Sequence, residues 1–546
     1  SLSYFLPIIF KAFNPDPVIN PNFNNENPII LSAILSLKRI TRETPFGTQV
    51  HALKILEACK ISLSTNKLAN NQVQWLMQVA GHCLSVIEDN EICQKQTEEI
   101  VSFQCQILDI LCALEAGDEK VNPELPGIGR IYKSREKVIE IVTNLRHLFT
   151  TIDRGIIRKT KQQEEDYIDQ SSKVMGSNDS GVNGNNDNGF GLGLDPIGAL
   201  EAQNNTSNSD SDYQHIRNHS GDDHNNNDGD NPKIVSDEIL EKEWQPMLNS
   251  LQNVVPLIEK VALIFANDDD VVSNACTLFE RLSKNLDQFF KQILDKIVPT
   301  LTQVFEINPH GSIINLCEYT SLIFFEQSSA QNLLLNICRT FTEKFEEAAQ
   351  HNQTFMENYS PVFIEFTNTL GIIMRKRFQI FTAVLSIKNK NDGQVAIILF
   401  EMLLQALSNR QNDSVLIRTS SYFLVDYWKT AAIKNDDCKN LGTHFLNKTI
   451  SIILQAFFGQ QGGGDENILS YYSDILFQIS KTVFPLFNSS FKEGFEAYFA
   501  ATELEELKSN KQHFESKVRL IVKERSNRNR FREHCKEWLL LRKNLV

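Results

Sequence analysis

The stretch Asp270–Asn308, DVVSNACTLFERLSKNLDQFFKQILDKIVPTLTQVFEIN, predicts one helix, a short turn and a second helix. In the first helix Val271, Ala275, Leu278 and Leu282 fall on one stripe. This is helical spacing, and it lacks the two-residue alternation of a strand.

The expected ends of these two helices follow from a few residues. Asp270 stands where an N-cap should stand, because its carboxylate can accept an unpaired backbone N–H. Pro299 must kink the second helix or mark where its main body begins, since proline lacks an N–H. The apolar residues of the second helix are Phe289, Phe290, Ile293, Ile297, Leu301, Val304 and Phe305.

Two amphipathic helices of this size cannot bury their apolar faces against each other alone, so each pair needs a neighbour on both sides. A unit of about 40 residues that requires stacked copies is typical of HEAT repeats. We therefore predict an all-α fold, a HEAT/ARM-like α-solenoid in which antiparallel helix pairs form a superhelical array. The composition agrees, because only 24 glycines and 16 prolines occur in 546 residues.

The same helical periodicity recurs along the rest of the chain. Because the chain begins with Ser1 rather than Met, directly at the helix predicted for Leu2–Phe13, we expect that an N-terminal part is missing. The other predicted helices are Leu2–Phe13, Pro28–Thr41, Gly47–Leu63, Asn71–Ile87, Glu91–Ala116, Glu136–Asp153, Ser236–Ala266, Gly311–Glu326, Gln331–Ala349, Tyr359–Phe381, Gly393–Leu407, Ser414–Ala432, Leu441–Phe458, Glu466–Phe487, Phe495–Leu507, Lys511–Glu524 and Asn527–Leu545.

One segment differs sharply in composition. Ser171–Pro232 is made of Asn, Asp, Ser and Gly, with ten acidic and two basic residues, so its charge is 2 − 10 = −8 of the total −14. Such a segment cannot bury enough apolar surface to fold alone. We expect helical repeats at 1–159, a disordered acidic insertion at 160–235, and helical repeats again at 236–546.

Several classes of function find no support in the sequence. No phosphate-binding loop, dinucleotide fingerprint, zinc-protease or nucleophile-elbow motif occurs, so we expect no enzyme and no cofactor. The ten cysteines are scattered without a C-x-x-C, which indicates buried, reduced thiols. An acidic chain is a poor general binder of nucleic acid. No apolar run approaches the ~20 residues of a membrane helix, and no signal peptide is seen.

Three apparent motifs have simpler explanations. The glycine-rich Gly189–Gly193 lies in the insertion with no strand before it, which indicates low complexity. His215, His219 and His224 lack a folded frame and are expected to be solvated spacers rather than metal ligands. His82 and Cys83 are adjacent in a helix, where their side chains point apart.

Two basic features and the tryptophans remain. The C-terminal run could hold an acidic partner, or the chain's own acidic segment, or could simply be the solvated end of a terminal repeat. Trp75, Trp244, Trp428 and Trp538 are expected in the core. The basic residues are Arg154, Arg158, Lys159 and Lys161 before the insertion, and Lys517, Arg519, Lys523, Arg525, Arg528, Arg530 and Arg532 near the end.

An ordered series of short segments resembles one known family. In this order the segments are Val73–Gln78 (VQWLMQ), Leu148–Asp153 (LFTTID), Ala275–Glu280 (ACTLFE), Tyr472–Phe477 (YSDILF) and Val522–Arg528 (VKERSNR). The series is similar to the importin-13/transportin-3 group of β-karyopherins, and closer to the importin-13 side. The resemblance covers the C-terminal half of such a receptor.

The resemblance implies a nuclear transport receptor that carries protein cargo on a concave face and releases import cargo when Ran-GTP binds. Its expected partners are cargo, Ran in its GTP form and FG-repeat nucleoporins, without nucleic acid or membrane. The main Ran site is expected in the missing N-terminal part, so no cargo or Ran residues are assigned. The expected location is shuttling between cytoplasm and nucleus. The alternatives are a transportin-3-like import receptor, or a HEAT-repeat scaffold or regulatory subunit without a transport role.

Overall fold

A computed structural model describes most of the chain, in two compact units. One unit comprises Ser1–Ile156 with Glu243–Val546, and the other Ile157–Lys242. Of the second unit only a few residues beside its two ends are described. The described residues are 2–16, 18–20, 23–65, 67–125, 129–159, 161–162, 237–351, 353–384, 392–408, 413–458, 466–501 and 508–543. The predicted acidic insertion, 160–235, therefore lies outside the described residues except for 161–162.

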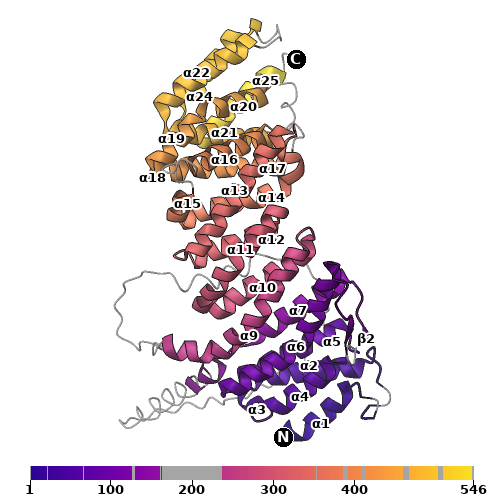
Figure 1. The fold of residues 1–546 in the computed structure, drawn as a ribbon. Coiled ribbons are helices and arrows are strands. Elements are labelled where there is room, and N and C mark those ends of the chain that lie inside the picture. The colour runs from indigo at the N-terminus through magenta and orange to yellow at the C-terminus, as the bar shows by residue number, and fades with distance from the viewer. Residues whose placement is uncertain are drawn as a thin grey trace, which may run out of the picture. The chain divides into compact units, whose positions relative to one another are not determined.

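The described chain is almost entirely helical, which confirms the predicted all-α solenoid (Figure 1). The strands β1 (Glu124–Leu125) and β2 (Gly129–Arg130) form one short antiparallel pair. The helices are α1 Leu2–Phe13, α2 Pro28–Glu43, α3 Pro45–Gln49, α4 Ala52–Leu63, α5 Asn70–Ser85, α6 Asn90–Glu115, α7 Arg135–Thr151, α9 Asp237–Ile264, α10 Asp269–Leu286, the 3₁₀ helix η2 Asp287–Phe290, α11 Lys291–Ile307, α12 Gly311–Ile323, α13 Ser328–Gln350, α14 Phe355–Lys376, α15 Phe378–Val384, α16 Asp392–Leu407, α17 Ser414–Asp426, the π-helix η3 Tyr427–Ala431, α18 Ala432–Lys434, α19 Asp436–His444, α20 Leu446–Phe458, α21 Glu466–Thr482, α22 Phe484–Ala501, α24 Lys511–Lys523 and α25 Arg528–Lys543.

Successive helices of the large unit alternate between two rows. In the first row each helix packs on the next, in the order α2, α5, α7, α10, α12, α14, α17, α21 and α25. The second row contains α4, α6, α9, α11, α13, α16, α20, α22 and α24. Here α9 is tied to α6 by a hydrogen bond from Asn249 to Gln94 (2.9 Å) and to α11 by one from Thr300 to Glu259 (2.6 Å). This alternation is the arrangement of a helical-repeat solenoid.

The stretch Asp270–Asn308 folds as a helix, a turn and a helix, but its details differ from the prediction. Asp268, not Asp270, caps α10, and its carboxylate accepts from the backbone N–H groups of Asp270 and Val271 (3.1 Å each). Three consecutive aspartates offer the same capping chemistry, so the sequence did not distinguish them. Pro299 lies inside α11 and does not mark the start of its main body.

Other predicted boundaries were also wrong. The helix expected at Tyr359–Phe381 begins at Phe355 and ends before Arg377, after which α15 starts. The expected Glu466–Phe487 ends at Thr482, and α22 begins with Pro485 in its first turn, where proline is tolerated. The expected Gly47–Leu63 and Leu441–Phe458 each divide into two helices.

Phenylalanine side chains fill the core where three helices meet. Phe341 of α13 contacts Phe305 of α11 at a ring-centroid distance of 5.4 Å and Phe366 of α14 at 4.6 Å. All three rings are at most 1% exposed. Each buried ring contributes roughly 2–3 kcal/mol to folding. Such contacts run between neighbouring helices, so each pair depends on the next for its stability.

Candidate functional site

In the described part of the chain, no group of three or more His, Cys, Asp or Glu side chains is placed to hold a metal. His82 and Cys83, which are adjacent in α5, belong to no such group. All ten thiols are free, and all but the half-buried Cys105 are buried. Burial raises the pKa of Cys59 and of Cys276 to about 12, which keeps these thiols protonated and unreactive.

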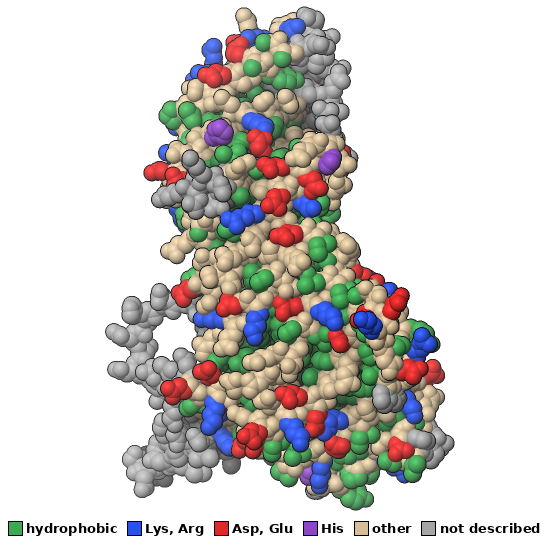
Figure 2. Space-filling model, viewed as in Figure 1, with side chains coloured by type: hydrophobic (Ala, Val, Ile, Leu, Met, Phe, Trp, Pro, Cys, Tyr) green, Lys and Arg blue, Asp and Glu red, His purple; other side chains and the backbone are tan. Residues whose placement is uncertain are grey.

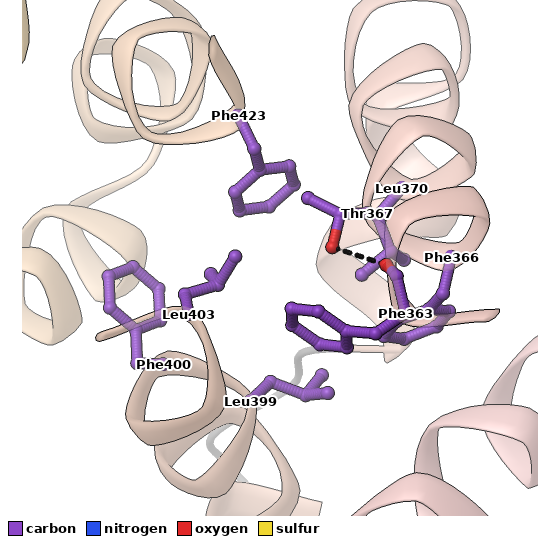
Figure 3. A pocket seen from close by; sticks show the side chains of 8 residues that line it. All are labelled: Phe363, Phe366, Thr367, Leu370, Leu399, Phe400, Leu403 and Phe423. Carbon is purple, nitrogen blue, oxygen red and sulfur yellow. Dashed lines mark hydrogen bonds between the residues drawn. The ribbon is translucent and has the colours of Figure 1, made fainter. Parts of the chain in front are cut away.

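One apolar cavity lies between α14, α16 and α17 (Figure 3). Its volume is about 20 Å³, far below the roughly 150 Å³ of a cavity that holds a benzene ring. The Thr367 hydroxyl donates to the Phe363 carbonyl (2.8 Å), so it is already satisfied. The lining residues are Phe363, Phe366, Thr367, Leu370, Leu399, Phe400, Leu403 and Phe423. This cavity is a packing gap between repeats rather than a ligand site.

Some side chains of the C-terminal basic run form ion pairs within the fold. Arg528 and Arg532 of α25 both donate to the carboxylate of Asp474 on α21, through their Nε atoms at 2.7 Å and again through Nη2. Asp474 is 3% exposed. Burial by itself would raise the pKa of Asp474, but the two guanidinium groups outweigh it and hold the pKa below its ordinary value. These two arginines therefore anchor the last helix.

Other members of that run also have internal partners. The Arg525 guanidinium lies 3.7 Å from the centroid of the Phe484 ring, and Lys517 pairs with Glu537 at 2.6 Å. Arg525 and Arg528 are nevertheless exposed, so these side chains combine internal contacts with hydration, and the interpretation of the run as a solvated end stays a prediction. Their internal pairing also weakens the alternative of a docking site for an acidic partner.

Arg154 does not belong to an exposed basic cluster. It is 8% exposed, and its Nη1 donates to the carbonyls of Leu84 (2.7 Å) and Ile87 (2.6 Å) at the end of α5. Its Nε donates to the carbonyl of Glu243 in α9 (3.0 Å). One guanidinium therefore joins chain segments on both sides of residues 157–242.

Side-chain donors also tie neighbouring first-row helices together. The carbonyls at the end of a helix have no partner within that helix, so a donor from the next repeat can satisfy them. Two such bonds run from Asn285 to the Phe149 carbonyl (3.0 Å) and from Arg377 to the Leu322 carbonyl (3.1 Å). A further bond runs from Thr482 of α21 to the Trp428 carbonyl inside η3 (3.2 Å). These bonds set the register of each repeat on its neighbour.

The extended helix surfaces are what remain for binding other molecules. On the face drawn in Figure 2, Lys and Arg side chains alternate with Asp and Glu, without a broad region of one sign.

Trp428 and Trp538 are buried, as predicted, whereas Trp75 and Trp244 are only half-buried. None of the helices in the described ranges is apolar enough over a sufficient length to cross a membrane. Gly189–Gly193 and the three insertion histidines lie outside the described residues.

Comparisons with known proteins agree with this geometry. A family model described as the Transportin-3/Importin-13 fourth TPR domain matches residues 245–348. Importin-13 of Gallus gallus is 21% identical over 550 residues, and importin-13 of Homo sapiens is 20% identical over 550 residues. Each alignment covers 99% of this chain and 44% of the relative, so the chain spans less than half the length of the curated relatives that it matches.

A solved structure described as Importin13 in a cytosolic state has the same fold, with a TM-score of 0.59 and 16% identity. The structural alignment covers 98% of this chain and 49% of the importin-13 chain. The expected resemblance to the importin-13/transportin-3 group is therefore confirmed along the chain. The expectation that the chain is no enzyme agrees with these relatives, which are named importins.

Proposed function

We propose that this chain is part of a nuclear transport receptor of the importin-13 type, which carries protein cargo through the nuclear pore under Ran-GTP control. The observation that carries the proposal is the extent of the likeness. It covers 99% of the chain at 21% identity, and so includes both sides of the insertion. The helical rows supply an extended surface, and the described residues hold no metal-binding group.

The physical mechanism follows from nearest-neighbour packing. Because each repeat contacts only its neighbours, small rotations between repeats add up along the array. A ligand that binds one arrangement better than another shifts the population toward it, and so weakens a ligand with the opposite preference. In this proposal cargo and Ran-GTP are two such ligands. Repeats at 1–159 and 236–546 form one receptor segment, and the insertion at 160–235 interrupts it.

FG-repeat nucleoporins and shuttling between cytoplasm and nucleus are part of the same proposal. An importin-13-like receptor is favoured over a transportin-3-like one because the curated relatives that match are importin-13 proteins. A scaffold without transport activity predicts instead that the protein stays in the cytoplasm when nuclear export is blocked.

Affinity capture with and without GTP-locked Ran tests the proposal. The immobilised receptor that contains this chain is incubated with cell extract, and then washed with Ran-GTP or with Ran-GDP. We expect a defined set of proteins to be released by Ran-GTP alone. A receptor that retains the same proteins in both washes, and that does not bind FG-repeats, would refute the transport role and favour the scaffold.

A further inference from the structure

Four consecutive first-row helices carry basic side chains at the same level. We call these residues the first-row basic cluster: Lys38 and Arg42 on α2, His82 on α5, Arg146 and His147 on α7, and Arg281 on α10. α2 packs on α5, and the charge of its Lys38 reaches both His82 and His147. Hydrogen bonds set the level of the other three helices. Gln78 of α5 bonds His147 (2.8 Å), and Thr143 of α7 bonds Asn274 of α10 (3.2 Å).

The cluster carries positive charge that the fold does not neutralise. Lys38, Arg146 and Arg281 form no ion pair with any acidic side chain in the described part of the chain. Arg42 does have an acidic partner, because it pairs with Glu43 (2.9 Å), which also pairs with Arg39 (3.4 Å). This differs from the C-terminal run, where a buried aspartate engages two arginines.

The lowered pKa values of the two histidines agree with this excess of positive charge. The pKa of His82 is lowered to about 4, mainly by burial and in addition by the nearby charges of Arg42 and Lys38. The pKa of His147 is also lowered to about 4, mainly by burial and in addition by the charges of Arg146 and Lys38. Both imidazoles are therefore neutral at pH 7. The charge of Arg42 also acts on Lys38, and the charge of Arg281 acts on Arg146. A region in which like charges repel one another in this way attracts an anion.

The spacing of the helices selects the shape of that anion. Packed helices lie about 8–10 Å apart, so cations on successive helices repeat at this interval. A polyproline II segment advances about 3.1 Å per residue with three residues per turn, so every third side chain lies on one side at about 9 Å spacing. A strand would place residues i and i+3 on opposite faces. The match therefore favours a polyproline II peptide that crosses the helices.

We propose that the first-row basic cluster is a docking surface for an acidic peptide segment of a partner protein, with a carboxylate at every third residue. Four successive carboxylates then face α2, α5, α7 and α10: Lys38, Arg146 and Arg281 pair with the first, third and fourth, and the neutral His82 on α5 donates a hydrogen bond to the second. A nucleic acid suits this surface less well, because the chain as a whole carries a net charge of −14 and repels a long polyanion. This inference does not rest on the proposed transport function.

The test is fluorescence anisotropy with the full chain and two labelled peptides of identical composition, based on proline, glutamine and glutamate. One peptide has glutamate at every third position, and the other has the same glutamates at irregular spacing. We expect the periodic peptide to bind at least tenfold more tightly at low salt, with an affinity that falls as salt rises. Equal binding of both peptides, or no binding of the periodic one, would overturn the proposal.

Matched charge reversals locate the surface. Lys38→Glu combined with Arg281→Glu should weaken binding of the periodic peptide at least tenfold. Lys296→Glu, an exposed lysine on α11 in the second row, should leave it unchanged. Should the double variant not fold, by circular dichroism and thermal melting, the exposed Arg281→Gln alone is expected to weaken binding severalfold. An equal loss in Lys296→Glu, or tighter binding of a single-stranded RNA of matched charge, would contradict the assignment.

Discussion

At the scale of single residues, Asp474 shows how a charge is stabilised inside the array. Its carboxylate is buried and accepts hydrogen bonds from two arginines of α25. Removing one partner of a buried pair leaves the others uncompensated, which is strongly destabilising. Here Arg528 and Arg532 are 52% and 30% exposed, so water compensates part of the loss.

We expect Asp474→Asn to destabilise the attachment of α25 by about 2 kcal/mol. Amide hydrogen exchange in α25 at pH 7 should then accelerate by about thirtyfold, since 1.4 kcal/mol is a factor of ten. Glu306→Gln, at an exposed glutamate of α11, is the control and should change nothing. Unchanged exchange in α25 of the Asp474 variant would show that the ion pair does not hold the helix.

The same residue predicts a pH dependence. The folded-state pKa of Asp474 lies below its ordinary value, so its contribution to stability is complete above the unfolded pKa of about 3.9. The contribution is lost as the pH falls through the folded pKa. Exchange in α25, corrected for the intrinsic rate, should be constant from pH 7 to pH 5 and rise below pH ~4. Asp474→Asn should remove this step.

The thiols offer a second prediction at this scale. Nine of the ten are buried, and burial raises the pKa of the remaining Cys105 to about 11. A thiolate is the reactive form, so the native protein should react slowly. At pH 8, Ellman's reagent should modify at most about one thiol in the first minutes, and all ten after denaturation. Cys105→Ser should abolish the early reaction, and early modification of several thiols would contradict the burial.

At the scale of elements, α5 and α7 cross closely at Gly81. A Cβ at this position would lie 1.9 Å from Thr151 Oγ1 and 2.8 Å from the Leu148 carbonyl oxygen. The glycine is required here by space rather than by backbone conformation. The neighbouring Ser85 uses the close approach, because its hydroxyl, which donates to the Gly81 carbonyl (2.8 Å), accepts from the Asp153 N–H that follows α7 (2.8 Å).

Gly81→Ala should therefore lower stability by about 2 kcal/mol through overpacking. Thermal melting measures the effect. Gly47→Ala is the matched control, since the nearest atoms to its Cβ would be at 3.6 Å. Adding Thr151→Ala removes the closest atom but leaves the backbone oxygen, so we expect partial rescue. A Gly81→Ala variant as stable as Gly47→Ala would mean that the helices move apart at little cost.

The elements also show how far sequence patterns reach. The spacing of apolar residues predicted α1 at Leu2–Phe13 and placed α10 and α11 correctly, because burial on one face imposes a period of 3.6. It missed the break at Arg377, which ends α14 and donates to the carbonyl of Leu322 in the neighbouring helix. No local signal marks a bond between residues 55 positions apart.

At the scale of the whole molecule, the array should respond locally to damage. Stability in a solenoid is close to a sum over repeats and their interfaces. We expect the faster exchange of Asp474→Asn to extend from α25 into α21 and α24 and to fade before α14. Exchange in α5 and α7 should equal that of the unchanged protein. A uniform acceleration along the chain would indicate one cooperative unit and would exclude a compliant array.

The candidate binding surfaces were only partly predictable. The C-terminal basic run is visible in the sequence, but its internal pairing with Asp474 is not, because α21 and α25 meet only after folding. The first-row basic cluster, in contrast, cannot be seen in the sequence and appears only in the folded chain. Lys38, Arg146 and Arg281 lie far apart in the sequence, and only the stacking of α2, α5, α7 and α10 brings them to one level.

The amino-acid pattern by itself determined that this protein is a stack of helical pairs, because each pair shows an apolar face on one side and cannot bury it alone. It also determined the absence of catalytic motifs and the ordered likeness to the importin-13 group. The tertiary structure decided which charged side chains form ion pairs within the fold and which do not. The reason is physical: the helical period is set by neighbours three or four residues apart, whereas an ion pair depends on distances that only the packed chain defines.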